Sequence, residues 1–427
     1  MRTLIIILVL LIQTSAFAQF EYVNLATGLT PTVNDARARA MGRTEITSTY
    51  GANSLFANPA NLGFVENMEV HLSSRSLFGS INDKDYWDLR PQETMSESYP
   101  FNLKLTQLSF IYPYYDPKTK NRAALAIGFN DFLDWGFTYK GEYENQESEY
   151  TETEDRKNTG GIRNISIAGA LNLNNKLAFG IGLSRTVLGK LKIVTEFDTD
   201  YYPPYSNYYI KRTREYYLET FNITLGATFK PNKKLAIGML FKPGFHITVD
   251  KYKYITTYPD GNTYSDSYSR DTEVKIPPIY GVGVTATPLN SMLLAVEYQN
   301  RPYADCKYES GNRLFRDIKN GHSFRVGFEY QTKYPIRLGF FNEAIPITDE
   351  NSGSEKPKSL TGFTAGTGIE SGNVRADIYG EYAYWKYQKF EASDPPMYGE
   401  YSESLISIGI TLTMKFPKKS KDSDDRY

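Results

Sequence analysis

The chain has 427 residues, and its 48 basic side chains nearly balance its 49 acidic ones, giving a formal net charge of -1. This balance supplies no basic field, so we do not expect nucleic acid as a partner. The one cysteine cannot form an internal disulfide, and aromatic residues make up 15% of the chain, a composition typical of long β-strands.

The first eighteen residues have the pattern of a signal peptide. Arg2 gives a positive start, residues 4–12 are apolar, and residues 16–18 read Ala-Phe-Ala, the small-residue pattern of a cleavage site. We predict cleavage between Ala18 and Gln19, and hence export. A membrane-anchoring helix is the alternative, but it needs roughly 20 apolar residues.

Residues 19–67 show too little alternation for a barrel wall. We expect them to form a hatch, or plug, inside the lumen of the barrel described next, because a barrel of this size encloses more space than its strand side chains fill. A disordered periplasmic arm is the alternative.

Residues 68–416 are predicted to form an all-β, transmembrane antiparallel β-barrel. Six short polar connections fall at 116–121, 174–176, 231–234, 288–291, 331–334 and 370–373. Seven long connections fall at 79–103, 141–160, 189–214, 251–271, 300–320, 344–358 and 391–402. Together they predict about 14 strands, with both barrel ends on the side of the short turns, which is the periplasmic side in bacterial outer-membrane barrels.

The third predicted strand carries an unusual pair, Asn130-Asp131. Outward-facing Leu125, Ile127 and Phe129 precede it in alternation, so the same alternation would turn the Asp131 charge toward lipid, where it is costly. We interpret the pair either as the rim of the membrane or as a kink in the strand.

The last predicted strand has the clearest period of two. Apolar residues occupy every second position from Ile406 to Phe416, and small or polar residues occupy the others, so one face suits lipid and the other a polar lumen. Residues 417–427 follow as a charged tail, which we expect in the periplasm.

No pattern in the sequence predicts an enzyme. His71, His246 and His322 are isolated, and no Gly-x-Ser-x-Gly motif occurs. The acidic stretch 142–155 lacks the spacing of a calcium loop. We therefore expect no catalytic residue, no metal and no cofactor.

A resemblance to a known family rests on two stretches before the first strand. Residues 35–42 read Asp-Ala-Arg-Ala-Arg-Ala-Met-Gly, and Asn58-Pro59-Ala60 opens the stretch 58–64. Together they resemble the N-terminal hatch of the FadL/TodX family of outer-membrane transporters of hydrophobic compounds, which is related to the PorV/PorQ-type barrels. Residues 276–283, 324–330 and 336–340 match later strands of that family. The chain departs from the family at Arg43-Thr44 and in its tail after Phe416.

The resemblance implies a function. It implies location in the bacterial cell outer membrane and passive uptake of hydrophobic small molecules, such as long-chain fatty acids. The alternative is a secretion-accessory or structural barrel that binds a protein partner. Expected contacts are outer-membrane lipid, lipopolysaccharide, a hydrophobic small-molecule ligand, and a periplasmic or secretion-system protein. The sequence names no ligand-contact residue.

Overall fold

The computed structural model describes most of the chain, namely residues 34–86, 104–134, 137–145, 150–201, 208–257, 262–268, 272–308, 318–345, 356–391 and 397–417. The predicted signal peptide with Ala18 and Gln19, residues 19–33, and all but the first residue of the predicted tail lie outside these ranges.

Three short helices precede the strands: α3 (Ala36–Ala40), η1 (Gly51–Leu55) and η2 (Pro59–Phe64). The strands are β1 (Met68–Tyr86), β2 (Lys104–Tyr115), β3 (Arg122–Asp134), β4 (Phe137–Asn145), β5 (Tyr150–Leu173), β6 (Leu177–Tyr201), β7 (Tyr208–Asn232), β8 (Leu235–Lys242), β9 (Phe245–Thr257), β10 (Thr263–Tyr268), β11 (Thr272–Ile276), β12 (Ile279–Leu289), β13 (Met292–Arg301), β14 (Lys307–Tyr308), β15 (Gly321–Tyr330), β16 (Ile336–Ile345), β17 (Lys358–Ser371), β18 (Val374–Glu391) and β19 (Met397–Phe416). A further 3-10 turn, η3 (Tyr303–Asp305), follows β13.

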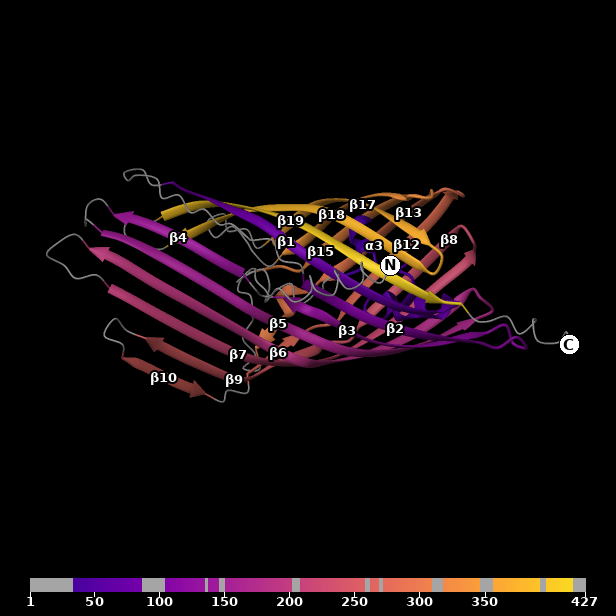
Figure 1. The fold of residues 1–427 in the computed structure, drawn as a ribbon, viewed down its shortest axis with the longest axis horizontal. Helices are drawn as coiled ribbons and strands as arrows, with labels where there is room; N and C mark the ends of the chain where they lie inside the picture. Colours follow the sequence, from indigo (N-terminus) through magenta and orange to yellow (C-terminus); the bar gives the residue numbers. More distant parts are fainter. Residues whose placement is uncertain are drawn as a thin grey trace.

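The strands form a closed antiparallel barrel (Figure 1). The first and last strands pair along their length, from Met68 opposite Phe416 to Tyr86 opposite Tyr398. β4, β9 and β14 continue β3, β8 and β13 after a break, and β10, β11 and β12 follow one another as a single interrupted strand along β9 and β8. The wall therefore has fourteen strands, which confirms the number predicted from the turns.

The two faces of the wall differ as the alternation predicts. Ile406 and Ile408 in β19 are each 47% exposed on the outer face, whereas Ser407 between them is 1% exposed. Exposed apolar side chains recur in this way around the wall, which is the pattern of a barrel that spans a membrane. No helix within the described ranges is long and apolar enough to cross a membrane.

Each of the six predicted short turns joins two consecutive strands that pair as an antiparallel hairpin. The long connections were predicted wrongly in part, because β5, β6 and β7 run through much of 141–160 and 189–214. The hairpin of β5 and β6 stays paired from Leu173–Leu177 to Tyr150–Tyr201. These strands have 24 or 25 residues, roughly twice the 9–11 that a tilted strand needs to span the hydrocarbon core. At the end of the barrel opposite the short turns, these strands extend far outward (Figure 1).

The described part of the hatch, from Asn34 to Phe64, fills the lumen. Nearly all of its side chains are buried, and Ala36, Ala40 and Met41 are 0% exposed. This confirms the hatch and excludes the alternative of a disordered arm for these residues.

Candidate functional site in the barrel lumen

Three arginines of the hatch form buried ion pairs with the wall. Arg37 at the start of α3 donates through Nε and Nη2 to both carboxylate oxygens of Glu329, at 2.8 and 2.9 Å. Arg39 pairs with Glu381 at 3.0 Å. Arg43 bridges the wall carboxylates, at 2.9 Å from Glu343 and 2.8 Å from Glu381.

Other charged groups on the wall complete the attachment. Arg325 pairs with Glu45 of the hatch at 3.2 Å and with Glu343 at 2.7 Å. Glu297 on β13 accepts hydrogen bonds from the backbone N–H groups of Glu45 and Ile46, at 2.8 and 2.6 Å. Because each such pair lies out of water, removing one partner leaves an uncompensated charge and costs about 3–5 kcal/mol. The hatch is therefore fixed electrostatically to β13, β15, β16 and β18.

Small residues let the hatch backbone touch the wall. Gly42 has φ +66° and lies against β16, where a Cβ built on Gly339 would be 1.9 Å from the Gly42 nitrogen. A Cβ on Gly327 would be 2.5 Å from the carbonyl oxygen of Met41. At Met41-Gly42 the backbone of the hatch therefore packs directly against the backbone of the wall.

The predicted hatch motif lies against the neighbouring wall. Asn58 caps η2 by accepting from the Ala60 N–H at 3.1 Å, and its amide donates to the Ile46 carbonyl at 2.9 Å. Glycines on β6 and β7 make room for it, because a Cβ on Gly180 would be 2.3 Å from the carbonyl carbon of Pro59. Asn58, Pro59 and Ala60 thus join two hatch segments to the wall.

The wall is interrupted at the other predicted pair, Asn130-Asp131. β2 and β3 remain paired only as far as Asn130, and the register between β3 and β5 shifts just after Asp131. β3 stays in register with β5 through Asp131, which lies opposite Arg163. The Asp131 carboxylate is nevertheless 0% exposed, because it pairs with Arg163 at 3.0 Å and with Lys104 at 3.1 Å.

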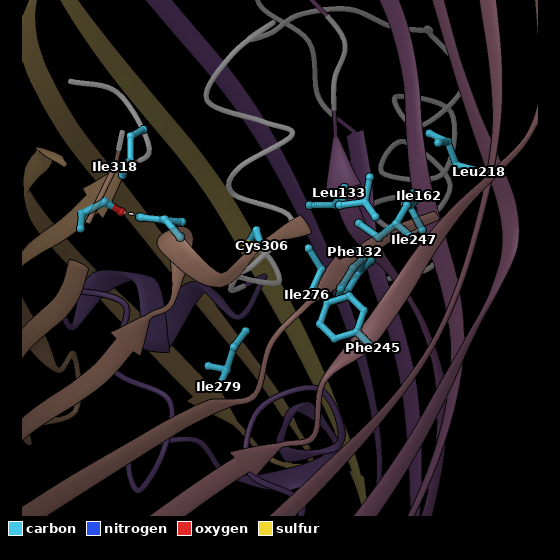
Figure 2. Packing of buried hydrophobic residues seen from close by; sticks show 13 residues of the cluster. Phe132, Leu133, Ile162, Leu218, Phe245, Ile247, Ile276, Ile279, Cys306 and Ile318 are labelled. Atoms are coloured by element: carbon cyan, nitrogen blue, oxygen red, sulfur yellow. Dashed lines mark hydrogen bonds between the residues drawn. The ribbon is translucent and has the colours of Figure 1, made fainter. Parts of the chain in front are cut away.

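Beyond this interruption, an apolar cluster fills part of the lumen on the long-loop side of the hatch (Figure 2). Phe132 of β3 and Phe245 of β9 meet edge to face with ring centroids 6.3 Å apart. The cluster comprises Phe132, Leu133, Ile162, Leu218, Phe245, Ile247, Val274, Ile276, Ile279, Tyr303, Cys306, Ile318 and Ala344. We call it the lumen cluster. It comes from at least six wall segments and gives this level of the lumen an apolar interior.

A second irregularity in the wall lies next to three members of the same cluster, Phe245, Ile276 and Ile279. Pro243-Gly244 separates β8 from β9, directly opposite Pro277-Pro278 between β11 and β12. Proline has no N–H to donate to a ladder, so the pairing stops after Lys242 opposite Ile279 and resumes at Phe245 opposite Ile276. We call this break the proline crease.

The remaining candidate groups form no catalytic or metal arrangement within the described ranges. His71 lies 3.0 Å from Glu69, His246 lies 3.0 Å from Glu273, and His322 accepts or donates a hydrogen bond with Tyr298. No group of three potential metal ligands occurs among these residues. Cys306 is buried, and burial, with a smaller contribution from Asp305, raises the pKa of its thiol to about 12.

The charged attachment of the hatch was not predicted from the sequence, in which the alternation was taken to place small or polar residues on the lumen face. One signal could have found it. Arg325 and Glu329 sit at inward positions within an otherwise alternating strand, where an unpaired charge would be unfavourable. Charged residues at inward strand positions therefore indicate that oppositely charged groups lie across from them in the lumen.

Comparison with solved structures gives the same fold. The toluene transporter TodX of Pseudomonas putida is 14% identical, with a TM-score of 0.61 over 91% of this chain and 100% of that one. A FadL homologue of Pseudomonas aeruginosa is 12% identical, with a TM-score of 0.58 over 94% and 100%. The toluene transporter TbuX of Ralstonia pickettii is 15% identical, with a TM-score of 0.56 over 90% and 98%. These likenesses establish the FadL-type barrel fold.

The sequence itself has a family match. No curated protein matches it, but the BamG family model matches residues 1–345. This range contains the hatch, with its three arginines, and the wall as far as the end of β16. Because the match covers most of the chain, the protein belongs to the BamG family.

Proposed function

We propose that this barrel lies in the bacterial outer membrane and lets hydrophobic small molecules cross by diffusion. The observation that carries the proposal is the lumen cluster, which lies where β3 separates from β2. The lumens of bacterial outer-membrane barrels are generally polar, so a buried apolar layer at this level suits an apolar solute rather than an ion or sugar.

The hatch and the interruption in β3 are in direct contact, which supports a coupled passage. The side-chain amide of Asn34, at the start of the described hatch, donates to the backbone carbonyl of Asp131 at 3.3 Å. A shift of the hatch would therefore disturb the point where β3 leaves its neighbour. No energy source is needed, because an apolar solute moves down its own gradient.

The class of solute is the finer part of the proposal. Solved structures with this fold include toluene transporters and a FadL homologue, and the lumen cluster offers aromatic and aliphatic contacts to either kind of molecule. We propose long-chain fatty acids, or molecules of similar apolar character, as the solutes.

Reconstitution into liposomes tests the proposal. We expect the full-length protein to speed entry of a fluorescent long-chain fatty acid relative to empty liposomes while excluding a hydrophilic dye. Deletion of residues 19–63, which removes the hatch, should change the fatty-acid rate and admit the dye, since the charged wall would then face water. A wild-type rate equal to that of empty liposomes would overturn the transport function.

One observation favours a second function, that of an accessory barrel holding a protein partner. The hatch is fixed by several buried ion pairs, and β5, β6 and β7 extend into a tall sheet. A sealed lumen with a projecting sheet suits a scaffold more than a channel. Absence of fatty-acid entry through a correctly folded barrel would favour this second function.

A further inference from the structure

The outer face of the wall has an open apolar hollow centred on a glycine. Gly169 of β5 lies in a row of outward-facing residues, between Leu125 of β3 and Ile181 of β6. Because glycine has no side chain, the surface is recessed here, and an apolar hollow of about 550 Å³ remains. Large apolar side chains, among them Phe110 and Ile167, surround it. We call it the wall hollow.

The wall hollow lies at the depth of lipid acyl chains. Leu125 is five residues after Lys120, and Ile181 is five residues after Lys176, both lysines being in short turns. At about 3.3 Å per residue this separation is roughly 16 Å along the strand, close to half of the roughly 30 Å hydrocarbon core. Tyr114, 60% exposed, lies between the turn and the hollow, as expected of an aromatic residue at the membrane boundary.

The two short turns at the ends of these strands are basic. Lys118 and Lys120 lie in the turn between β2 and β3, and Lys176 lies in the turn between β5 and β6. All three side chains are exposed. The turns are joined, because the Asn174 N–H donates to the side-chain oxygen of Asn121 at 3.2 Å. We call the three lysines the basic arc.

Nearby carboxylates leave the charge of the basic arc uncompensated. The Asp116 carboxylate stays within its own turn, where it accepts from the Lys118 backbone N–H at 2.9 Å and from the Thr119 hydroxyl at 2.7 Å. Glu66 pairs with Arg122 at 2.8 Å. Within the described ranges, no ion pair neutralises the side chains of the basic arc. These lysines are therefore available to an external anion.

The positive charge is concentrated on one side of this end of the barrel. The adjoining turn 231–234 adds two lysines, whereas the turn 331–334 has one and the turn 288–291 has no charged residue. Beyond these, Glu370 pairs with Lys415 at 2.6 Å. The basic side of the rim and the wall hollow therefore lie on the same strands.

We propose that the wall hollow and the basic arc together bind one anionic phospholipid, with an acyl chain in the hollow and the phosphate headgroup at the lysines. Basic clusters at a membrane surface attract anionic lipid, and lysine side chains can extend along the wall toward a phosphate. Because short turns face the periplasm in bacterial outer-membrane barrels, the lipid would come from the periplasmic leaflet. The proposal rests on the membrane location proposed above and not on transport.

Matched lipids test the site. Full-length protein in an uncharged detergent is titrated with phosphatidylglycerol and with phosphatidylcholine of identical acyl chains, and bound lipids are counted by native mass spectrometry. We expect the first phosphatidylglycerol to bind at least tenfold more tightly than phosphatidylcholine. Glycerol phosphate, which has no acyl chain, should not displace it at equal concentration.

Two results with the wild-type protein would overturn the proposal. Equal affinity for the two lipids would indicate an acidic protein surface, rather than a lipid, as the partner of the basic arc. Displacement by glycerol phosphate would show that the lysines bind a free anion and that the hollow contributes nothing.

Filling the hollow tests the contribution of the acyl chain. A Cβ built on Gly169 meets only the Leu125 side chain at 3.6 Å and the Ala124 carbonyl oxygen at 3.9 Å, so Gly169→Leu should fold. We expect it to weaken phosphatidylglycerol binding at least tenfold. Gly380→Leu is the matched control, because Gly380 is exposed on β18 and nothing lies within 4 Å of a Cβ there. Unchanged binding by folded Gly169→Leu would refute the hollow as the site.

Charge variants test the contribution of the headgroup. Lys118→Gln, Lys120→Gln and Lys176→Gln combined should abolish the preference for phosphatidylglycerol, whereas arginine at the same three positions should keep it. Lys333→Gln, in the turn 331–334, should leave the preference unchanged. A preference retained by the triple glutamine variant would refute the basic arc as the headgroup site.

The liposome assay answers a separate question. It can be run in phosphatidylcholine vesicles without anionic lipid, so loss of fatty-acid entry with a retained preference for phosphatidylglycerol overturns transport alone. Fatty-acid entry without that preference overturns the lipid site alone.

Discussion

Glu381 holds two arginines of the hatch at once, Arg39 at 3.0 Å and Arg43 at 2.8 Å. Replacing it with glutamine keeps the size and removes the charge, so buried Arg39 loses its carboxylate partner and Arg43 keeps only Glu343. We expect Glu381→Gln to lower the free energy of unfolding by about 3–5 kcal/mol, measured by denaturant titration in detergent.

An exposed ion pair provides the control for Glu381. Glu370 pairs with Lys415 at 2.6 Å, but its side chain is 48% exposed. Glu370→Gln should change stability by no more than about 1 kcal/mol. Equal effects of the two variants would contradict the view that buried pairs fix the hatch.

Cys306 should be unreactive in the folded protein. Its thiol is 0% exposed, and burial raises its pKa to about 12. The raised pKa means that the protonated thiol dominates at pH 7–9, whereas the thiolate is the nucleophile. We expect no maleimide labelling of the folded barrel in this pH range and full labelling after denaturation. Rapid labelling of the folded protein would show that the lumen cluster opens readily.

Asp131 shows what the pattern of one strand leaves open. β3 stays in register with β5 as far as Asp131, yet the carboxylate is 0% exposed, because Arg163 and Lys104 pair with it. These two partners lie on β5 and β2, so the local sequence of β3 does not specify them.

At the scale of elements, the hatch touches β16 through glycines. A Cβ on Gly339 would lie 1.9 Å from the Gly42 nitrogen, and the next residue, Arg43, is held by Glu343 and Glu381. We expect Gly339→Ala to displace residues 41–43 and to lower the thermal unfolding temperature by several degrees, with faster proteolysis of the hatch.

Gly380 on β18 gives a matched control, because nothing lies within 4 Å of a Cβ built there. Gly380→Ala should therefore leave the unfolding temperature and the protease sensitivity of the hatch close to those of the wild type. If Gly339→Ala behaves in the same way, the hatch is not held in the close contact described above.

Element boundaries were predictable at one end of the barrel only. Short turns with Asn, Pro and Lys mark the six reversals at one end of the barrel, because tight turns restrict residue type. On the other side, β5 and β6 continue as a paired ladder through Tyr- and charge-rich sequence. Outside the membrane both faces of a strand can be polar, so the apolar alternation that identifies a strand is lost although the backbone pairing continues.

At the scale of the whole molecule, the barrel and its plug could be predicted, but the chemistry inside could not. Fourteen strands follow from turn spacing, and a lumen of that size needs filling. The partners of the hatch arginines lie 292 to 342 residues away along the chain. The pairing of Arg37 with Glu329 is therefore not visible until the wall is closed.

The distance between those partners also orders the biogenesis of the protein. The hatch is synthesised first, yet its carboxylate partners lie on β15, β16 and β18, among the last strands made. Until those strands are in place, Arg37, Arg39 and Arg43 must remain in water. The hatch is therefore made early but fixed to the wall late. We therefore expect the plug to be seated only after these strands are in place, and an incompletely inserted chain to expose its basic N-terminal segment.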